Sequence, residues 1–275
     1  MSEIAAAVRD GVLPGRVWMY SNYHCNLACA YCITDSAPGV ARRELSRARM
    51  LAIAHEAHEL GFRALGVTGG EPFLLPWMPD HVAELSDILP IVALSNATLF
   101  TGPRLEAMRV LSGRPVQVQV SLDRPDPEAN DGHRARENFR KVVDAIPRLI
   151  DRGVRMRLAS TVDEQDDEER EELCALHRSL GIADEDHVVR PIVHRGRAAA
   201  NDMGRDAGVD DLDPELTITA DGAFWSPFGP SVRDGRLDTD LLITRTTTPL
   251  EMPARMLLRL VERRPPGGDG RRGIP

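Results

Sequence analysis

The chain has 275 residues, of which 42% are hydrophobic, enough to bury the core of one large α/β domain with a small appendage. Its formal net charge of -8 gives no long-range attraction for phosphate backbones, which argues against nucleic acid as a partner. No apolar run reaches the roughly 20 residues that span a bilayer, and the first 15 residues lack the regions of a signal peptide. The sequence therefore predicts a cytoplasmic protein with no membrane partner.

Along the chain, apolar β-rich runs alternate with amphipathic helical stretches, which is the pattern of repeated β-α units around a parallel sheet or barrel. Six such units are expected after a short N-terminal leader. The predicted strands cover residues 17–21, 64–68, 91–95, 116–122, 154–162 and 187–193. The predicted helices cover residues 42–60, 80–89, 104–111, 137–151 and 168–180.

Beyond Arg195 this alternation stops and a Gly-, Asp- and Pro-rich connection follows. Asp221 and Gly222 then lie between two β-prone runs, which predicts a hairpin over residues 216–225. An amphipathic helix is predicted over residues 253–263. The C-terminal part thus differs in organisation from the repeated units that precede it.

Three of the four cysteines form a C-x3-C-x2-C run at Cys25, Cys29 and Cys32, directly after the first predicted strand. Three thiolates on one tight loop can ligate three irons of a cubane cluster and leave the fourth iron open for a small molecule. The alternative is a zinc site that adds His24, because zinc also accepts thiolate and imidazole ligands. Such crowding is unlike a secreted disulfide framework, so the cysteines indicate a metal site in a reducing compartment.

A second motif, Gly69-Gly70-Glu71, follows the second predicted strand. Glycines let the backbone approach a ligand closely, and a carboxylate beside them can accept hydrogen bonds from an ammonium group. Alone, the motif is equally consistent with a simple strand-to-loop turn. Its position one β-α unit after the cysteine loop makes a shared ligand site the more specific interpretation.

Together, the two motifs resemble those of the radical S-adenosylmethionine (SAM) superfamily, and the resemblance covers nearly all of residues 17–200. It implies that the three cysteines bind one [4Fe-4S] cluster and that SAM is the second cofactor. It also implies that Tyr31 lies beside the adenine of SAM. The positions that the resemblance implies as SAM contacts are Tyr31, Gly69, Gly70, Glu71, Ser95, Asn96, Ser121, Asp123 and Arg134.

Some of these positions depart from the superfamily's usual motifs. Ser95-Asn96-Ala97 is similar to its ribose-contacting Thr-Asn-Gly-type segment, with changed outer residues. Asn130 stands where a His is usual in a His-Asp-x-x-Arg segment. Arg134 is a candidate partner for the SAM carboxylate, since a guanidinium matches a carboxylate fork, and the alternative is a surface arginine at a helix start.

The part after the barrel resembles the C-terminal extension of the SPASM/Twitch subgroup, in the approach to a Gly-Arg-Ala turn over residues 191–198 and in the hairpin. No cysteine follows Cys174, so the expected extension is a degenerate, Twitch-like cap without an auxiliary cluster. The expected fold is α/β, a partial (β/α)6 TIM-like barrel with a short α/β extension. The expected organisation is a leader at 1–16, the barrel at 17–200, the cap at 201–263 and a disordered tail at 264–275.

The implied activity is the cleavage of SAM by one electron from the cluster, giving methionine and a 5′-deoxyadenosyl radical that abstracts hydrogen from substrate. An electron donor such as flavodoxin or ferredoxin is implied as a partner. About 16 residues before the first strand are too few for a recognition domain, which favours a small-molecule substrate such as a sugar-like biosynthetic intermediate. The alternatives are a peptide modifier with a separate recognition partner and, from another class, a structural or regulatory zinc- or cluster-binding protein.

The absence of cysteines after Cys174 also bears on reaction type. Relatives can use an auxiliary cluster to take up an electron from the product radical, so its absence favours a redox-neutral lyase, mutase or epimerase over a dehydrogenase. Cys174 lies in a predicted amphipathic helix, and a buried inert thiol is the expected interpretation. Its alternative role is that of a hydrogen-atom donor, and no other catalytic residue is assigned.

Overall fold

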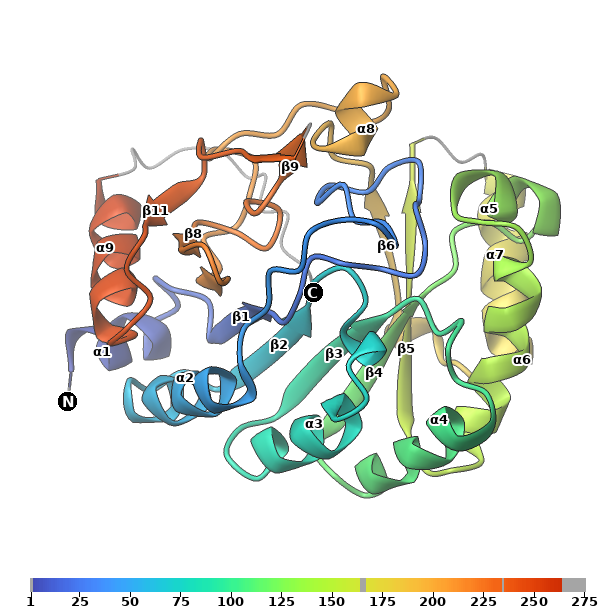
Figure 1. Ribbon diagram of the computed structural model, residues 1–275, viewed down its shortest axis with the longest axis horizontal. Helices are drawn as coiled ribbons and strands as arrows, with labels where there is room; N and C mark the ends of the chain where they lie inside the picture. The colour runs from blue at the N-terminus through green and yellow to red at the C-terminus, as the bar shows by residue number, and fades with distance from the viewer. Residues whose placement is uncertain (1, 164–166, 234, 264–275) are drawn as a thin grey trace.

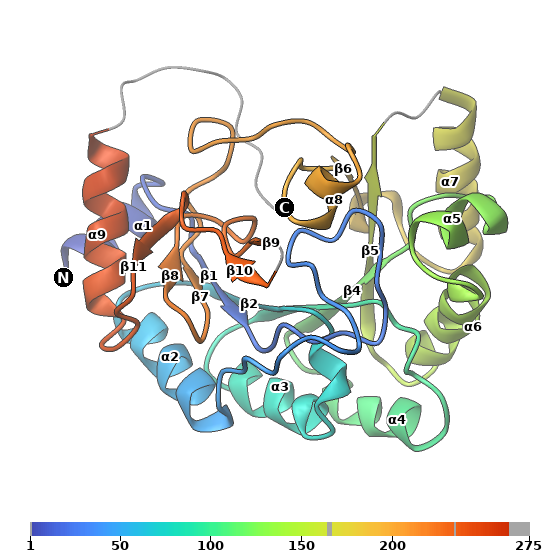
Figure 2. The ribbon, with the colours of Figure 1, turned by 45° about the horizontal axis from the view of Figure 1, so that its top comes forward.

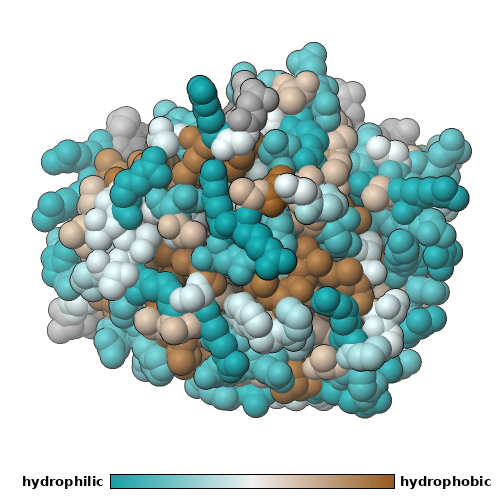
Figure 3. Space-filling model, in the orientation of Figure 1, coloured by the Kyte–Doolittle hydropathy of each residue, from teal (hydrophilic) through white to brown (hydrophobic). Residues whose placement is uncertain are grey.

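This computed structural model describes residues 2–163, 167–233 and 235–263, so the predicted disordered tail lies outside the described residues. Figure 1 shows a curved sheet with helices along its outer side. No helix in the described part of the chain is both long and apolar enough to cross a membrane. Figure 3 shows hydrophilic residues over most of one face, with hydrophobic ones in several patches between them.

The strands of the main sheet are β1 Arg16–Tyr20, β2 Ala64–Thr68, β3 Ile91–Ser95, β4 Val116–Ser121, β5 Arg155–Val162, β6 His187–Pro191, β7 Thr217–Ile218, β8 Ala223–Phe224 and β11 Leu242–Thr244. A separate hairpin consists of β9 Val232–Arg233 and β10 Arg236–Leu237. The α-helices are α1 Glu3–Arg9, α2 Arg47–Glu59, α3 Met78–Ser86, α4 Gly102–Ala107, α5 Pro127–His133, α6 Asn138–Ile150, α7 Asp167–Ser179, α8 Arg197–Ala200 and α9 Glu251–Glu262. Short 3-10 turns occur at Pro72–Leu74, Met108–Leu111 and Asp184–Asp186.

Strands β1 to β6 are parallel and lie in sequence order, which confirms the α/β fold with a partial barrel. The sheet is not closed into a barrel, because β6 is one edge and β11 is the other. Helices between successive strands cover the outer face (Figure 2). Since all six strands are parallel, their C-terminal ends meet at one rim, where β/α barrels place their chemistry.

Packing between strands and helices follows the two-residue alternation of the strands and the 3.6-residue repeat of the helices. Along β4, Val118 and Val120 lie on one face, and the polar side chains alternate with them on the other. In α6, Val142, Ile146 and Leu149 recur at helical spacing and are fully buried in the same hydrophobic core. Each such burial contributes roughly 1.5–3 kcal/mol to folding, so the outer helices hold the rim in place.

Two regions are more closely integrated than the sequence predicted. Within the expected leader, residues 3–9 form α1, which is capped by Ser2, buries Ile4 and Val8, and packs against α9. The predicted hairpin is present as β7 and β8, but β7 pairs in parallel with β1, so that it continues the barrel's own sheet. The helix predicted from residue 42 begins later, after the N-cap Ser46.

Candidate active site

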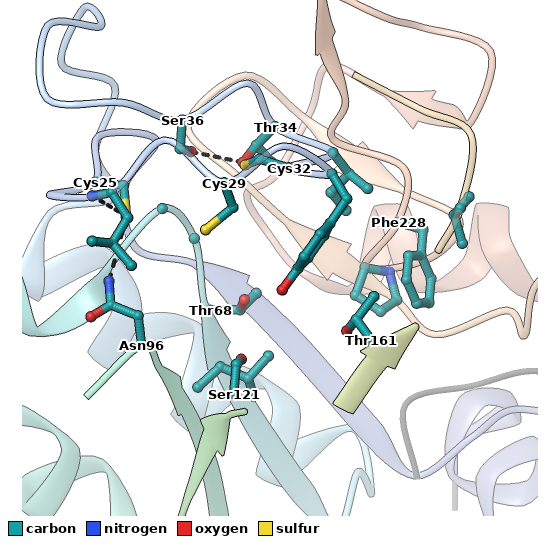
Figure 4. Close-up of a pocket in the computed structure, with 18 of the residues that line it drawn as sticks. Cys25, Cys29, Cys32, Thr34, Ser36, Thr68, Asn96, Ser121, Thr161 and Phe228 are labelled. Atoms are coloured by element: carbon teal, nitrogen blue, oxygen red, sulfur yellow. Dashed lines mark hydrogen bonds between the residues drawn. The ribbon is translucent and has the colours of Figure 1, made fainter. Parts of the chain in front are cut away.

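A cavity opens at the rim, between the C-terminal ends of the strands and the loop that follows β1. Figure 4 shows the three cysteines on this loop above Thr68, Ser121 and Thr161. Ten of the twelve predicted site residues line the cavity, namely Cys25, Cys29, Cys32, Tyr31, Gly69, Gly70, Ser95, Asn96, Ser121 and Arg134. The other two, Glu71 and Asp123, are buried behind its wall.

The cysteine thiols have few partners within the protein. Cys25 Sγ accepts a hydrogen bond from Leu27 N at 3.3 Å and lies 3.6 Å from Asn96 Nδ2. Burial raises the pKa of Cys25 to about 12, with a further contribution from the charge of Glu71, and burial also raises the pKa of Cys29. Burial therefore favours the thiol form of Cys25 and Cys29, whereas cysteine binds iron as the thiolate.

The two glycines bring the loop after β2 against the entry to the cysteine loop. Gly70 N donates to Asn22 O at 3.0 Å, and a Cβ on Gly70 would lie 2.2 Å from His24 O. Gly69 has φ 143°, and a Cβ there would lie 2.4 Å from Asn22 O. Glycine is thus required for contact between these chain segments, in addition to any approach to a ligand.

The turn before α8 also contacts the cysteine loop. Arg197 donates from its backbone N to Cys32 O at 2.8 Å and from Nη1 to Cys29 O at 2.9 Å. Gly196 has φ 56°, and a Cβ there would lie 2.0 Å from Ile33 O. Neither residue was predicted as part of the site, although both lie in the Gly-Arg-Ala segment that the sequence distinguishes.

Glu71 connects the loops after β2 and β3. Its carboxylate accepts hydrogen bonds from Phe73 N at 3.0 Å, Ser95 Oγ at 2.9 Å and Asn96 N at 2.7 Å. Burial raises the pKa of Glu71 to about 7, although these hydrogen bonds act in the opposite direction. Because its oxygens accept hydrogen bonds from the protein, Glu71 holds the two loops of the cavity wall together. The sequence instead suggested a direct contact between Glu71 and an ammonium group.

Tyr31, Asp123 and Arg134 form a hydrogen-bonded cluster at the wall, in which Asp123 and Arg134 are buried. Asp123 Oδ2 accepts from Arg134 Nη1 at 3.0 Å and from Tyr31 OH at 2.5 Å, and Arg134 also contacts Tyr31 OH. Arg134 is only 7% exposed, so its interpretation as a surface arginine is wrong. Its buried Nε has no partner among the described residues, and Arg134 lines the cavity.

Asn130, at the position where a His is usual, has a structural role. It is fully buried, its Oδ1 accepts from Asp123 N at 3.1 Å, and its Nδ2 donates to Asn138 Oδ1 at 3.0 Å. The side chain therefore fixes the backbone at Asp123 against the start of α6. This explains how the segment keeps its shape without the His.

The remaining cysteine lies away from the cavity. Cys174 Sγ is 3.9 Å from Nδ1 of His187, between α7 and β6, and Cys174 does not line the cavity. The thiol is partly exposed, which differs from the buried thiol that was predicted. Its location favours an inert role over hydrogen donation.

The arrangement of ligands also bears on the zinc alternative. Within the described residues, no group of three or more His, Cys, Asp or Glu side chains is close enough to hold a single metal ion. Zinc needs four ligands within about 2.3 Å of one point, whereas a cubane distributes its thiolates over separate irons. His24 is instead close to a carboxylate, with its Nδ1 3.6 Å from Glu44 Oε1. The site fits a cluster better than a zinc ion.

Residues 19–177 match the family model described as the Radical SAM superfamily. The chain therefore belongs to the radical SAM superfamily, and its cofactors are a [4Fe-4S] cluster and SAM. A probable GTP 3',8-cyclase from Archaeoglobus fulgidus is 34% identical over 132 residues, which cover 47% of this chain and 43% of that protein. Mycofactocin maturase MftC from Mycolicibacterium smegmatis is 28% identical over 197 residues, covering 70% and 46% respectively. The chain spans less than half the length of these curated relatives.

Solved structures show the same fold at low sequence identity. Native anSMEcpe with bound AdoMet and Cp18Cys peptide has a TM-score of 0.63 at 12% identity, covering 91% of this chain and 84% of that one. Streptococcus suis SuiB bound to S-adenosylmethionine has a TM-score of 0.58 at 17% identity, covering 75% and 47%. These likenesses support the partial barrel.

Proposed function

We propose that Cys25, Cys29 and Cys32 hold the [4Fe-4S] cluster and that SAM binds beside it in the cavity, for hydrogen abstraction from a small-molecule substrate. One observation carries this proposal. The three thiols line a single cavity together with polar groups from the ends of β2, β3 and β4. Three thiolates leave one iron open to SAM, and the polar groups surround the space next to it.

When bound, the reduced cluster and SAM supply methionine and a 5′-deoxyadenosyl radical that abstracts hydrogen from substrate. The chain's own residues bind SAM and orient it. The backbone at Gly69 and Gly70 and the side chains of Ser95, Asn96 and Ser121 offer polar atoms along one wall. Arg134 presents its guanidinium to the SAM carboxylate while Asp123 and Tyr31 hold it in place.

The substrate class and partners follow the same proposal. The relative named as a GTP 3',8-cyclase supports a small-molecule substrate, and a sugar-like biosynthetic intermediate fits that class. A peptide substrate with a separate recognition partner is the alternative, favoured by the match to AlbA of Bacillus subtilis, a bacteriocin biosynthesis protein. Flavodoxin or ferredoxin is the proposed electron donor. A redox-neutral outcome is the favoured reaction type, and the location of Cys174 argues against epimerisation that depends on that thiol.

Iron content and SAM cleavage test the proposal. Anaerobically reconstituted protein should bind about four irons per chain and form 5′-deoxyadenosine from SAM when reduced with dithionite. The triple variant with Cys25, Cys29 and Cys32 changed to Ala should lose both properties. Cys174→Ala is the matched control and should keep both. Iron retained by the triple variant, or zinc in place of iron in the wild type, would contradict the assignment.

A further inference from the structure

Arg190 is a second arginine of the cavity, and no motif drew attention to it. It lies on β6, is partly buried and lines the cavity. Its Nε donates to Thr161 Oγ1 at 3.1 Å. Within residues 2–163, 167–233 and 235–263, no carboxylate pairs with it at 4.0 Å or less. Its two Nη groups thus lack an anionic partner.

The groups around the cavity give Arg190 no ion-pair partner within 4.0 Å. Arg134 and Arg190 are the two arginines that line it, and no Asp or Glu does so. Asp123, the nearest buried carboxylate behind the wall, is already shared by Arg134 and Tyr31. Asp211 lines a small hollow on the other side of Arg190 but forms no ion pair with it. A partly buried cation that is not directly paired with an anion is costly, and a bound anion would offset that cost.

The position of Arg190 separates it from the proposed SAM contacts. Those contacts come from the loops after β1 to β4 and from Arg134, whereas Arg190 lies with Thr161 of β5 and Phe228 of the extension. Figure 4 shows Thr161 and Phe228 together on the side of the cavity away from Cys25 and Asn96. SAM carries one carboxylate, and Arg134 is its proposed partner. Arg190 is therefore left for a different molecule.

We propose that Arg190 binds an oxyanion group of the substrate, a carboxylate or a phosphate, through its two free Nη groups. The inference rests on the proposed function, because it assumes that SAM occupies the β1–β4 side. With Nε held by Thr161, the end of the guanidinium presents a fork that matches two oxygens of either anion. The substrate is thereby defined as an acidic small molecule with its anion near β6.

Anion binding to the SAM-loaded, reconstituted protein tests this inference. Inorganic phosphate and acetate serve as probes in calorimetric titrations under anaerobic conditions. At least one of them should bind, and which one binds distinguishes a phosphate from a carboxylate. Its Kd should rise at least about tenfold in Arg190→Gln, because a charge-assisted hydrogen-bond pair is lost. Arg140→Gln, at a side chain that is 63% exposed on α6, removes the same charge elsewhere and should leave the Kd unchanged.

The SAM affinity of the same variants distinguishes a failure of the inference on Arg190 from a failure of the proposed function. Arg190→Gln should keep its iron and bind SAM within about twofold of the wild type. If SAM binding weakens as much as anion binding, Arg190 holds SAM and the inference is overturned. It is also overturned if neither probe binds to the wild type, or if both variants bind the probe equally. Failure of the proposed function would instead be seen as a wild-type protein that holds no iron or binds no SAM.

Discussion

At the scale of single residues, the Asp123–Arg134 pair must keep a buried charge compensated and must also hold the guanidinium at the wall of the cavity. A buried ion pair gives little net stability, because desolvation offsets the attraction, but loss of one partner leaves an uncompensated buried charge. Here Asp123 has three donors, since Thr161 N at 2.9 Å binds its other oxygen. The geometry therefore fixes the guanidinium firmly at the wall of the cavity.

Arg134→Gln should weaken SAM binding by about 10- to 100-fold, the effect of losing a charge-assisted contact worth roughly 1.5–3 kcal/mol. Iron content should stay near four per chain, because Arg134 is not among the proposed ligands. Titration of SAM into reconstituted protein measures the effect. Asp123→Asn together with Arg134→Gln removes both buried charges and controls for instability of the single variant. An unchanged SAM Kd in both would place the carboxylate elsewhere.

The sequence points most directly to the residues of the cavity where they are concentrated in short segments. Cys25, Cys29 and Cys32 occupy eight consecutive residues, so their spacing alone indicates a shared ligand. Arg197 contacts Cys29 O across 168 residues, and no local spacing reveals such a contact. Arg190 carried a weaker signal, a charged residue directly after the apolar pair Val188 and Val189 in β6. Its meaning depends on which face of β6 it occupies and on what lies opposite.

At the scale of elements, strands were predicted more accurately than short helices. The ranges 64–68 and 91–95 coincide with β2 and β3, because each is an apolar run that ends at polar or glycine residues. Helix α5 was missed although Asp126 caps it and Pro127 begins it. It has only seven residues, among them Gly132 and Asn130, which are poor helix formers. Tertiary hydrogen bonds of Asn130 stabilise it instead.

Contact between α7 and β6 predicts a pH effect on stability. His177 is buried with its ring 3.9 Å from that of His187, and neither of its nitrogens has a partner in the described structure. Burial lowers the pKa of His177 to about 3, and His187 contributes to this shift. As pH falls from about 6.5 towards 3, the unfolded chain binds a proton there that the folded chain does not. Stability is therefore lost over this range, by up to about 1.4 kcal/mol per pH unit.

His177→Phe should reduce this acid sensitivity, because it keeps an aromatic ring and removes the titrating group. The difference in Tm between pH 7.5 and pH 5.5 should be smaller in the variant than in the wild type. His55→Gln, on the exposed side of α2, is the control and should behave as the wild type does. Equal pH dependence in His177→Phe and the wild type would show that His177 is protonated in the folded protein.

At the scale of the whole molecule, the C-terminal extension and the barrel share a sheet and a site. β7 pairs with Trp18 and Met19 of β1, and Trp18 Nε1 donates to the buried Glu215 Oε2 at 3.0 Å. Phe228 of the extension lines the cavity, and Tyr20 OH donates to Pro227 O at 2.5 Å. Because of these contacts, we expect the barrel and the extension to unfold together as one cooperative unit.

Glu215→Ala tests this cooperativity. The change leaves Trp18 Nε1 buried without its partner and removes the carboxylate 3.8 Å from Arg16, at a cost of about 1–3 kcal/mol. Hydrogen exchange followed by mass spectrometry should show equal loss of protection in peptides from β1, β2 and β7–β8, because one global opening exposes them all. Glu251→Ala, which removes an exposed ion pair with Arg255 in the same extension, is the control and should change protection little. Loss of protection confined to residues 217–224 would mean that the extension unfolds separately. The barrel, with its cysteine loop, would then be a cooperative unit of its own.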